Sequence, residues 1–179
     1  MPESSLAPHP SPEIIVRKFA HSGSVPNNLD LPLVIYRSAL PAGRRDLPGE
    51  IEALYRDNGW GGAWRWSVYD FHHFHANAHE VLAVSSGQAR IQFGGDDGEA
   101  FDVGVGDVVF IPAGVGHKRL GSTDDFQVVG GYPVGQVPDM RRDDSTAVAS
   151  LEDGINRVPI PAADPIYGVT GPLRRLWRN

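Results

Sequence analysis

The chain of 179 residues contains no cysteine. It therefore cannot form disulfides, use a thiolate nucleophile or hold an iron–sulfur cluster on cysteines, and any metal must be bound by nitrogen and oxygen ligands. Long apolar runs are also missing, which predicts that no segment crosses a membrane. The N-terminus has neither a basic start nor an apolar stretch, so we expect no secretory signal and a cytoplasmic location.

The chain has fewer basic than acidic residues. There are 16 Lys and Arg residues against 22 Asp and Glu residues, which gives a net charge of -6 and a pI near 5.6. Nucleic acids and anionic membranes both bind to basic surfaces, so we expect neither as a partner. The sequence favours a small-molecule ligand instead.

The composition changes along the chain and predicts one domain with extensions. Residues 1–12 carry four prolines and are expected to form a proline-rich N-terminal arm. Residues 13–63 are expected to form N-terminal strands and a helix that packs on the core. Residues 64–133, with short strand patterns between glycine- and aspartate-rich turns, should be the core of an all-β sandwich or barrel. Residues 134–179, rich in proline, should form a C-terminal extension that packs on this core.

Local patterns predict some of the elements. Glu13 to Ala20 and Leu31 to Leu40 are short, aliphatic and bounded by turn-forming residues, as strands are. Apolar residues at helical spacing predict a helix between Asp46 and Gly59. A short helical turn is expected over Ala147 to Asn156, and Trp64 to His75 is expected to be a strand.

Three of the seven histidines lie in the stretch HFHANAHE, which begins at His73. On the expected strand His73 and His75 point to the same face, because side chains alternate along a strand. An antiparallel return after a four-residue bend would set the Glu80 carboxylate beside these two imidazoles. His117 follows a glycine-containing turn that can re-aim its side chain. If the fold joins the two stretches, nitrogen and oxygen donors converge.

Both stretches resemble the conserved motifs of the cupin superfamily. The pattern His73-x-His75-x4-Glu80-x6-Gly87 is similar to the first motif in its germin-type spacing, and Gly106-x5-Pro112-x-Gly114-x2-His117 is similar to the second. The second motif usually ends in Asn, where this chain has Gly121, a departure that affects the local turn. The resemblance implies an all-β fold, the double-stranded β-helix or jelly-roll barrel, with one or two peripheral helices. It also implies one divalent transition metal on His73, His75, Glu80 and His117.

A narrower resemblance covers about residues 32 to 177. The segments HANAHEVL, PAGVGH, DDFQVVGGYPVGQ and DPIYGVTGPLRRLW are similar to those of the YjlB-like group of bacterial single-domain cupins. The group has no assigned reaction, so this similarity implies the fold and the site rather than the function.

Further residues near the motifs are interpreted as support or core. We expect His79 or Asn77 to support the ligands by hydrogen bonds; an alternative for His79 is a zinc pair with His75 on a helix. Tyr69 and Phe71 face the cavity on strand parity and are interpreted as core or pocket residues. His72 should point outward. Three tryptophans are expected in helix-on-barrel packing or a subunit contact: Trp60, Trp64 and Trp66.

The expected site leaves open positions on a metal ion, as catalysis and ligand binding both need. Nitrogen-rich ligation favours a transition metal such as Fe, Mn, Ni or Zn. We therefore predict a metal-dependent enzyme, a dioxygenase or an isomerase, that acts on a small organic molecule, although no catalytic residue beyond the ligands is evident. The alternative is a non-catalytic cupin that binds a small ligand or metal. The N-terminal arm and first strands predict a homodimer by strand addition.

Overall fold

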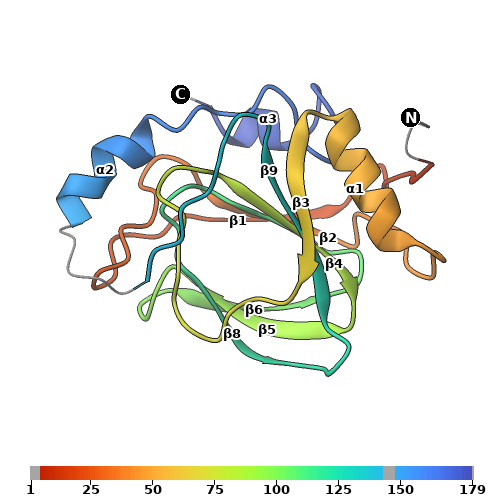
Figure 1. Cartoon of the computed structure of the whole chain (residues 1–179), viewed down its shortest axis with the longest axis horizontal. Coiled ribbons are helices and arrows are strands. Elements are labelled where there is room, and N and C mark those ends of the chain that lie inside the picture. Colours follow the sequence, from red (N-terminus) through yellow and green to blue (C-terminus); the bar gives the residue numbers. More distant parts are fainter. Residues whose placement is uncertain (1–4, 143–147, 179) are drawn as a thin grey trace.

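Two antiparallel sheets form the core of the protein in a computed structural model that describes residues 5–142 and 148–178 (Figure 1). The larger sheet has the strand order β1-β2-β7-β4-β9-β3 and the smaller one β6-β5-β8. The strands are β1 Glu13–Arg17, β2 Leu33–Arg37, β3 Trp60–Trp66, β4 Glu80–Ser86, β5 Gln88–Phe93, β6 Glu99–Gly104, β7 Val108–Ile111, β8 His117–Ser122 and β9 Gln127–Pro133. The helices are α1 Leu47–Asp57, α2 Val148–Asn156 and α3 Leu173–Leu176. The all-β prediction is confirmed, and a one-turn third helix is added to the expected two.

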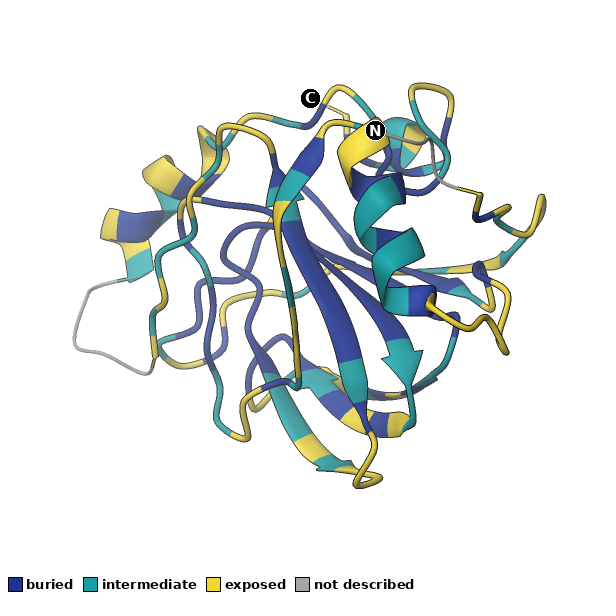
Figure 2. Ribbon diagram, turned by 45° about the vertical axis from the view of Figure 1, so that its right-hand side comes forward, coloured by how far each residue is buried: buried dark blue, intermediate teal, exposed yellow. Residues whose placement is uncertain are grey.

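The larger sheet is covered on both faces, because alternate side chains of its central strands enter different apolar clusters. In β4, Leu82 and Val84 face the smaller sheet, whereas Val81 and Ala83 join the cluster that contains α1 residues and the end of the chain. Figure 2 shows these central strands as almost wholly buried. Strands that are buried on both faces read as continuous apolar runs, as VLAV does.

The predicted helix is confirmed as α1. The Asp46 side chain accepts a hydrogen bond from the Gly49 N–H at 3.2 Å, which satisfies one of the free donors of the first turn. The helix ends before Gly59, whose φ of +76° suits glycine. Tyr55 is buried and its hydroxyl donates to the Val129 carbonyl at 2.9 Å, so α1 is fixed to the outer face of the sheet at β9.

The predicted strand from Trp64 to His75 is wrong in extent. β3 ends at Trp66, and the chain then runs irregularly to β4, with only single-residue bridges at His73 and Phe74. The expected strands in residues 13–20 and 31–40 are present as β1 and β2, and α2 matches the expected helical turn, whose first residue, Ala147, lies outside the described residues.

The first and last segments that the structure describes are held against the barrel. Leu6 is buried in the outer apolar cluster, and the Trp177 indole N–H donates to the Pro32 carbonyl at 2.8 Å. No helix among the described residues is long and apolar enough to span a membrane. β1 lies at the edge of the larger sheet with Ile14 and Val16 more than one-third exposed, and the homodimer through this region stays a prediction.

Candidate metal centre

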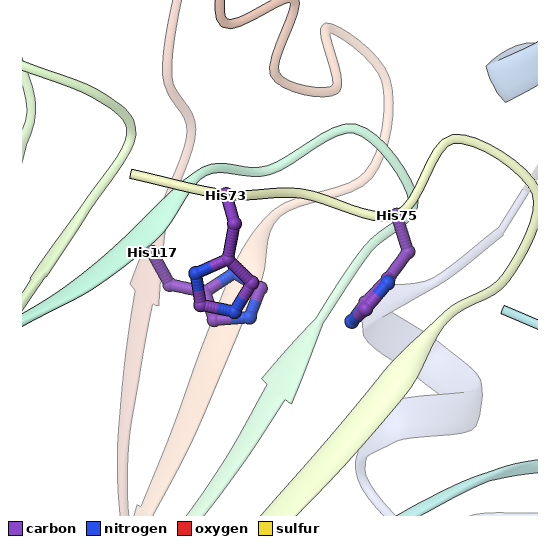
Figure 3. A group of neighbouring side chains, drawn as sticks. All are labelled: His73, His75 and His117. Carbon is purple, nitrogen blue, oxygen red and sulfur yellow. The ribbon is translucent and has the colours of Figure 1, made fainter. Parts of the chain in front are cut away.

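Three histidines from separate parts of the sequence meet inside the barrel (Figure 3). His117 is the first residue of β8, and a two-way backbone bridge ties it to His73, with N–H to carbonyl distances of 3.2 and 2.9 Å. His75 lies two residues after His73 on the same segment. One ring nitrogen of each histidine lies within 4.8 Å of the others. The structure thus brings together the three imidazoles that the sequence placed in two motifs.

Glu80 approaches this group from the larger sheet. It opens β4 with the same parity as Leu82, so its side chain faces the barrel interior. Its Oε2 lies 3.3 Å from His75 Nε2 and 3.2 Å from His117 Nε2. The residue is 2% exposed, and its carboxylate therefore contacts two of the three histidines out of reach of bulk water.

The three imidazoles are oriented in the same way. The Nδ1 atom of each hydrogen-bonds a backbone carbonyl: His73 that of Phe71 at 3.1 Å, His117 that of Val115 at 3.1 Å, and His75 that of Asp139. A carbonyl only accepts, so each Nδ1 must carry the proton. The Nε2 lone pairs of the neutral rings are then free, which is the tautomer that binds metals.

With all three imidazoles neutral, this arrangement has no positive charge at its centre. Glu80 Oε2 is buried, and no described residue donates to it in that state, because imidazoles protonated on Nδ1 present their Nε2 lone pairs to it. A buried carboxylate oxygen in such surroundings is unfavourable unless a cation, either a metal ion or a protonated imidazole, neutralises it. Three imidazole nitrogens and one carboxylate form a donor set that suits a divalent transition ion. The residues present therefore fit such an ion.

The pKa values of the residues in this group reflect burial and the negative charge of Glu80. Burial, with His117 close by, lowers the pKa of His73 to about 3. Burial alone would lower the pKa of His75, but the Glu80 carboxylate and the Asp139 carbonyl raise it to about 9. Burial would raise the pKa of Glu80, yet His75 and His117 hold it below its usual range. Without a metal, a proton on His75 therefore serves as the counter-charge of Glu80.

Tyr132 and Trp64, which the sequence analysis did not assign to the site, form a hydrogen-bonded chain that ends at Glu80. The Tyr132 hydroxyl, on β9, donates to Glu80 Oε1 at 3.3 Å and accepts from the Trp64 indole N–H at 2.8 Å. Burial, followed by the nearby Glu80, raises the pKa of Tyr132, so its hydroxyl stays protonated and acts as a donor. Strand parity on β9 was the one sequence signal that could have found it.

Asn77 is linked to His75 through Asp139, a partner that the sequence did not reveal. Its side-chain oxygen accepts from the Asp139 N–H at 2.7 Å, while Asp139 Oδ1 accepts from the Ala76 N–H at 2.8 Å and the Asn77 N–H at 3.2 Å. These reciprocal bonds fix the Asp139 carbonyl that orients His75. Asp139 follows β9, so a segment beyond the last strand takes part in orienting His75.

His79 does not contact Glu80, contrary to the expectation of a supporting hydrogen bond. Its parity on the approach to β4 is opposite to that of Glu80, so its buried ring lies beside Trp177, with ring centroids 4.9 Å apart. Its Nδ1 accepts from the Ala113 N–H at 2.9 Å and so anchors the turn that precedes His117. The alternative pair with His75 is also excluded, because residues 73–79 are not helical.

A cavity of about 330 Å³ opens beside the histidines. Tyr69 lies on its wall as expected but is 38% exposed, so it belongs to the entrance rather than the core. Phe71 stacks on Tyr69, with ring centroids 4.7 Å apart. The predicted parity put Phe71 on the cavity wall, but Phe71 does not line the cavity. His72 points outward as expected, with Nε2 2.8 Å from Asp96 Oδ1.

A bulge in β3 separates the tryptophans that we expected together. Gly61 pairs with Tyr132 but Trp64 pairs with Gly130, so β3 has one extra residue between these pairs and its side chains exchange faces. Trp60 therefore packs in the outer cluster near α1, as predicted, whereas Trp64 and Trp66 line the cavity. The prediction that Trp64 and Trp66 pack against a helix is therefore wrong.

Comparison with known proteins gives a consistent result. Residues 71–131 match the family model described as Cupin. The chain is 42% identical over 159 residues to the uncharacterized protein YjlB of Bacillus subtilis (strain 168). The aligned region covers 89% of this chain and 93% of that protein.

Among solved structures, procruciferin, an 11S globulin from Brassica napus, matches 64% of this chain and 23% of its own, with 18% identity and a TM-score of 0.37. Acireductone dioxygenase from Bacillus anthracis, solved with cadmium in its active centre, matches 51% of this chain and 62% of its own, with 22% identity and a TM-score of 0.35. This chain thus spans less than two thirds of either protein.

Proposed function

This chain belongs to the cupin family, and we propose that it is a metal-dependent enzyme of the oxygenase type that acts on a small organic molecule. One observation carries the proposal: Glu80 Oε2 is buried 3.3 and 3.2 Å from the Nε2 atoms of His75 and His117, and it has no donor while these imidazoles are neutral. The ligands that we propose are His73, His75, Glu80 and His117. The adjoining cavity supports a small-molecule substrate.

The protein's own residues would prepare the site in advance. The three backbone carbonyls fix the imidazole planes, and the Tyr132 hydroxyl holds Glu80 from the opposite side. A divalent metal such as Fe, Mn, Ni or Zn would supply Lewis acidity, and iron or manganese would also supply the redox chemistry that oxygenation requires. The apolar cavity wall would exclude water from the substrate.

The test is elemental analysis of untagged protein purified from its native host, beside a variant with His73→Ala and His117→Ala. His72→Ala is the matched control, because that neighbouring histidine pairs with Asp96 outside the site. We expect about one equivalent of iron or manganese, retained in the control and lost in the double variant. Absence of metal, or unchanged metal in the double variant, contradicts the proposal.

Oxygen uptake then separates the enzyme from the binding module. Metal-dependent oxygen consumption with any small organic substrate supports the dioxygenase. Metal-dependent conversion of a substrate without oxygen uptake would instead assign an isomerase. Tight binding of small ligands by the metal-loaded protein without any conversion would identify a non-catalytic module.

A further inference from the structure

Within residues 5–142 and 148–178, no lysine or arginine lines the cavity beside the proposed metal site. Three arginines on bordering segments have partners of their own. Arg119 donates to the Val68 carbonyl at 3.0 Å, Arg141 donates from Nε to Asp139 Oδ2 at 2.7 Å, and the Arg142 guanidinium lies 3.6 Å from the Phe71 ring centroid. The carboxyl groups on the wall are Glu80 and Asp139, and the charge of Asp139 is paired with Arg141. A substrate carboxylate away from the metal would therefore compete with Asp139 for Arg141 and would find no lysine or arginine on the described wall.

Aromatic and apolar surfaces make up most of the wall. Trp66 and Tyr69 stand at the entrance with ring centroids 4.9 Å apart, and they are 53% and 38% exposed. The remaining apolar members are Trp64, Val68, Leu82, Tyr132, Pro138 and Met140. Exposed ring faces beside a cavity provide contact area for a flat apolar molecule. The volume of about 330 Å³ is near the lower end for ligand pockets, which limits that molecule to about one ring system.

The charge balance restricts the polar part of the ligand. A divalent ion held by Glu80 and three neutral imidazoles would keep one net positive charge. One ionised oxygen donor neutralises it, and a second ionised group would be buried without a partner, which costs free energy. A molecule with two carboxylates is therefore disfavoured, and a singly ionised chelator is favoured.

We infer that the substrate is a compact ring-bearing molecule with one ionisable oxygen beside a neutral one, as in a hydroxy-ketone, and no further charge. This inference rests on the proposed metal site. It deepens that proposal by assigning recognition to the rings of Trp66 and Tyr69 and to the lack of any cation on the wall.

The test compares two pyranones with the same hydroxy-ketone chelate. Kojic acid carries a hydroxymethyl group where comenic acid carries a carboxylate, so the pair isolates one charge. Calorimetric titration of zinc-loaded protein should give at least about tenfold tighter binding of kojic acid. Trp66 stands at the exposed entrance of the cavity and is not one of the proposed zinc ligands. Trp66→Ala should therefore weaken kojic acid binding about fivefold or more and leave the zinc content unchanged.

A charge insertion provides the matched control. Met140 lines the cavity and is 51% exposed, whereas Val137 lies outside the wall and is 78% exposed. Met140→Lys should give the carboxylate of comenic acid a positively charged partner and so reduce the ratio of the affinities for kojic acid and comenic acid about tenfold. Val137→Lys should change this ratio less than about twofold.

The outcomes separate the two proposals. If the protein retains no zinc, the metal site itself is wrong and this inference falls with it. If zinc is retained but comenic acid binds as tightly as kojic acid, or neither binds, the metal site stands and the substrate class is overturned. Equal effects of the two lysine variants would likewise contradict recognition at the cavity wall.

Discussion

His75 donates from Nδ1 to the backbone carbonyl of Asp139, a residue 64 positions further along the chain. The imidazole belongs to the first cupin motif and the carbonyl to the C-terminal extension. The orientation of one proposed ligand thus depends on a segment outside both motifs. Asn77 completes the link, because its side chain accepts from the Asp139 N–H at 2.7 Å.

Substitution of Asp139 should weaken metal binding without unfolding the protein. In Asp139→Ala the bonds to the Ala76 and Asn77 N–H groups are lost, so the carbonyl that orients His75 is no longer fixed. We expect metal affinity to fall about 10- to 100-fold, as is typical when such supporting groups are removed. Competition with a chelator measures the change. Asp153→Ala, at an exposed position on α2, is the control and should retain full affinity.

Metal binding should release a proton from His75. In the metal-free protein the pKa of His75 is about 9, so the ring is protonated at neutral pH and its Nε2 must lose that proton before it can bind metal. We expect about one proton released per metal ion and an affinity that rises about tenfold per pH unit up to a pH of about 9. Calorimetry in two buffers of different ionisation enthalpy counts the protons. Release of none would contradict a protonated His75 in the metal-free protein.

Gly130 should be essential for the shape of the cavity. A Cβ at this position on β9 would overlap the indole ring of Trp64, the residue that pairs with Gly130 across the sheet. Gly130→Ala should therefore displace Trp64 and lower the free energy of unfolding by about 1–3 kcal/mol, as overpacking typically does. Thermal unfolding checks the effect. Gly104→Ala is the matched control, since a Cβ added there would meet nothing within 4 Å, and an equal loss in that variant would contradict the packing account.

The sequence predicted the histidine group well because local patterns encode it. The spacing of His73, His75 and Glu80 and the turn before His117 resemble known motifs, and the two stretches do meet in space. Strand parity placed His73 and His75 on one side although their segment is only bridged, not a regular strand. The motifs therefore correctly indicated that these residues lie close together, the predicted strand was wrong, and metal binding by them stays a prediction.

The missed residues depend on features that local sequence patterns do not specify. Asp139 contributes through its backbone carbonyl, which leaves no residue-type signal. Tyr132 reaches Glu80 from β9, and its position depends on strand pairing that single-sequence patterns do not specify. The bulge between Gly61 and Trp64 reverses the faces of β3, so a single extra residue moved two tryptophans from expected helix packing to the cavity.

The central claim is that His73, His75, Glu80 and His117 hold one metal ion. Anomalous diffraction from a crystal of the metal-loaded protein tests it most directly, with data collected above and below the absorption edge of the metal. The account predicts one strong peak among the three Nε2 atoms, about 2.0–2.3 Å from them and from a Glu80 oxygen. A metal-loaded crystal with no peak there, or with its only peak elsewhere, would contradict the account.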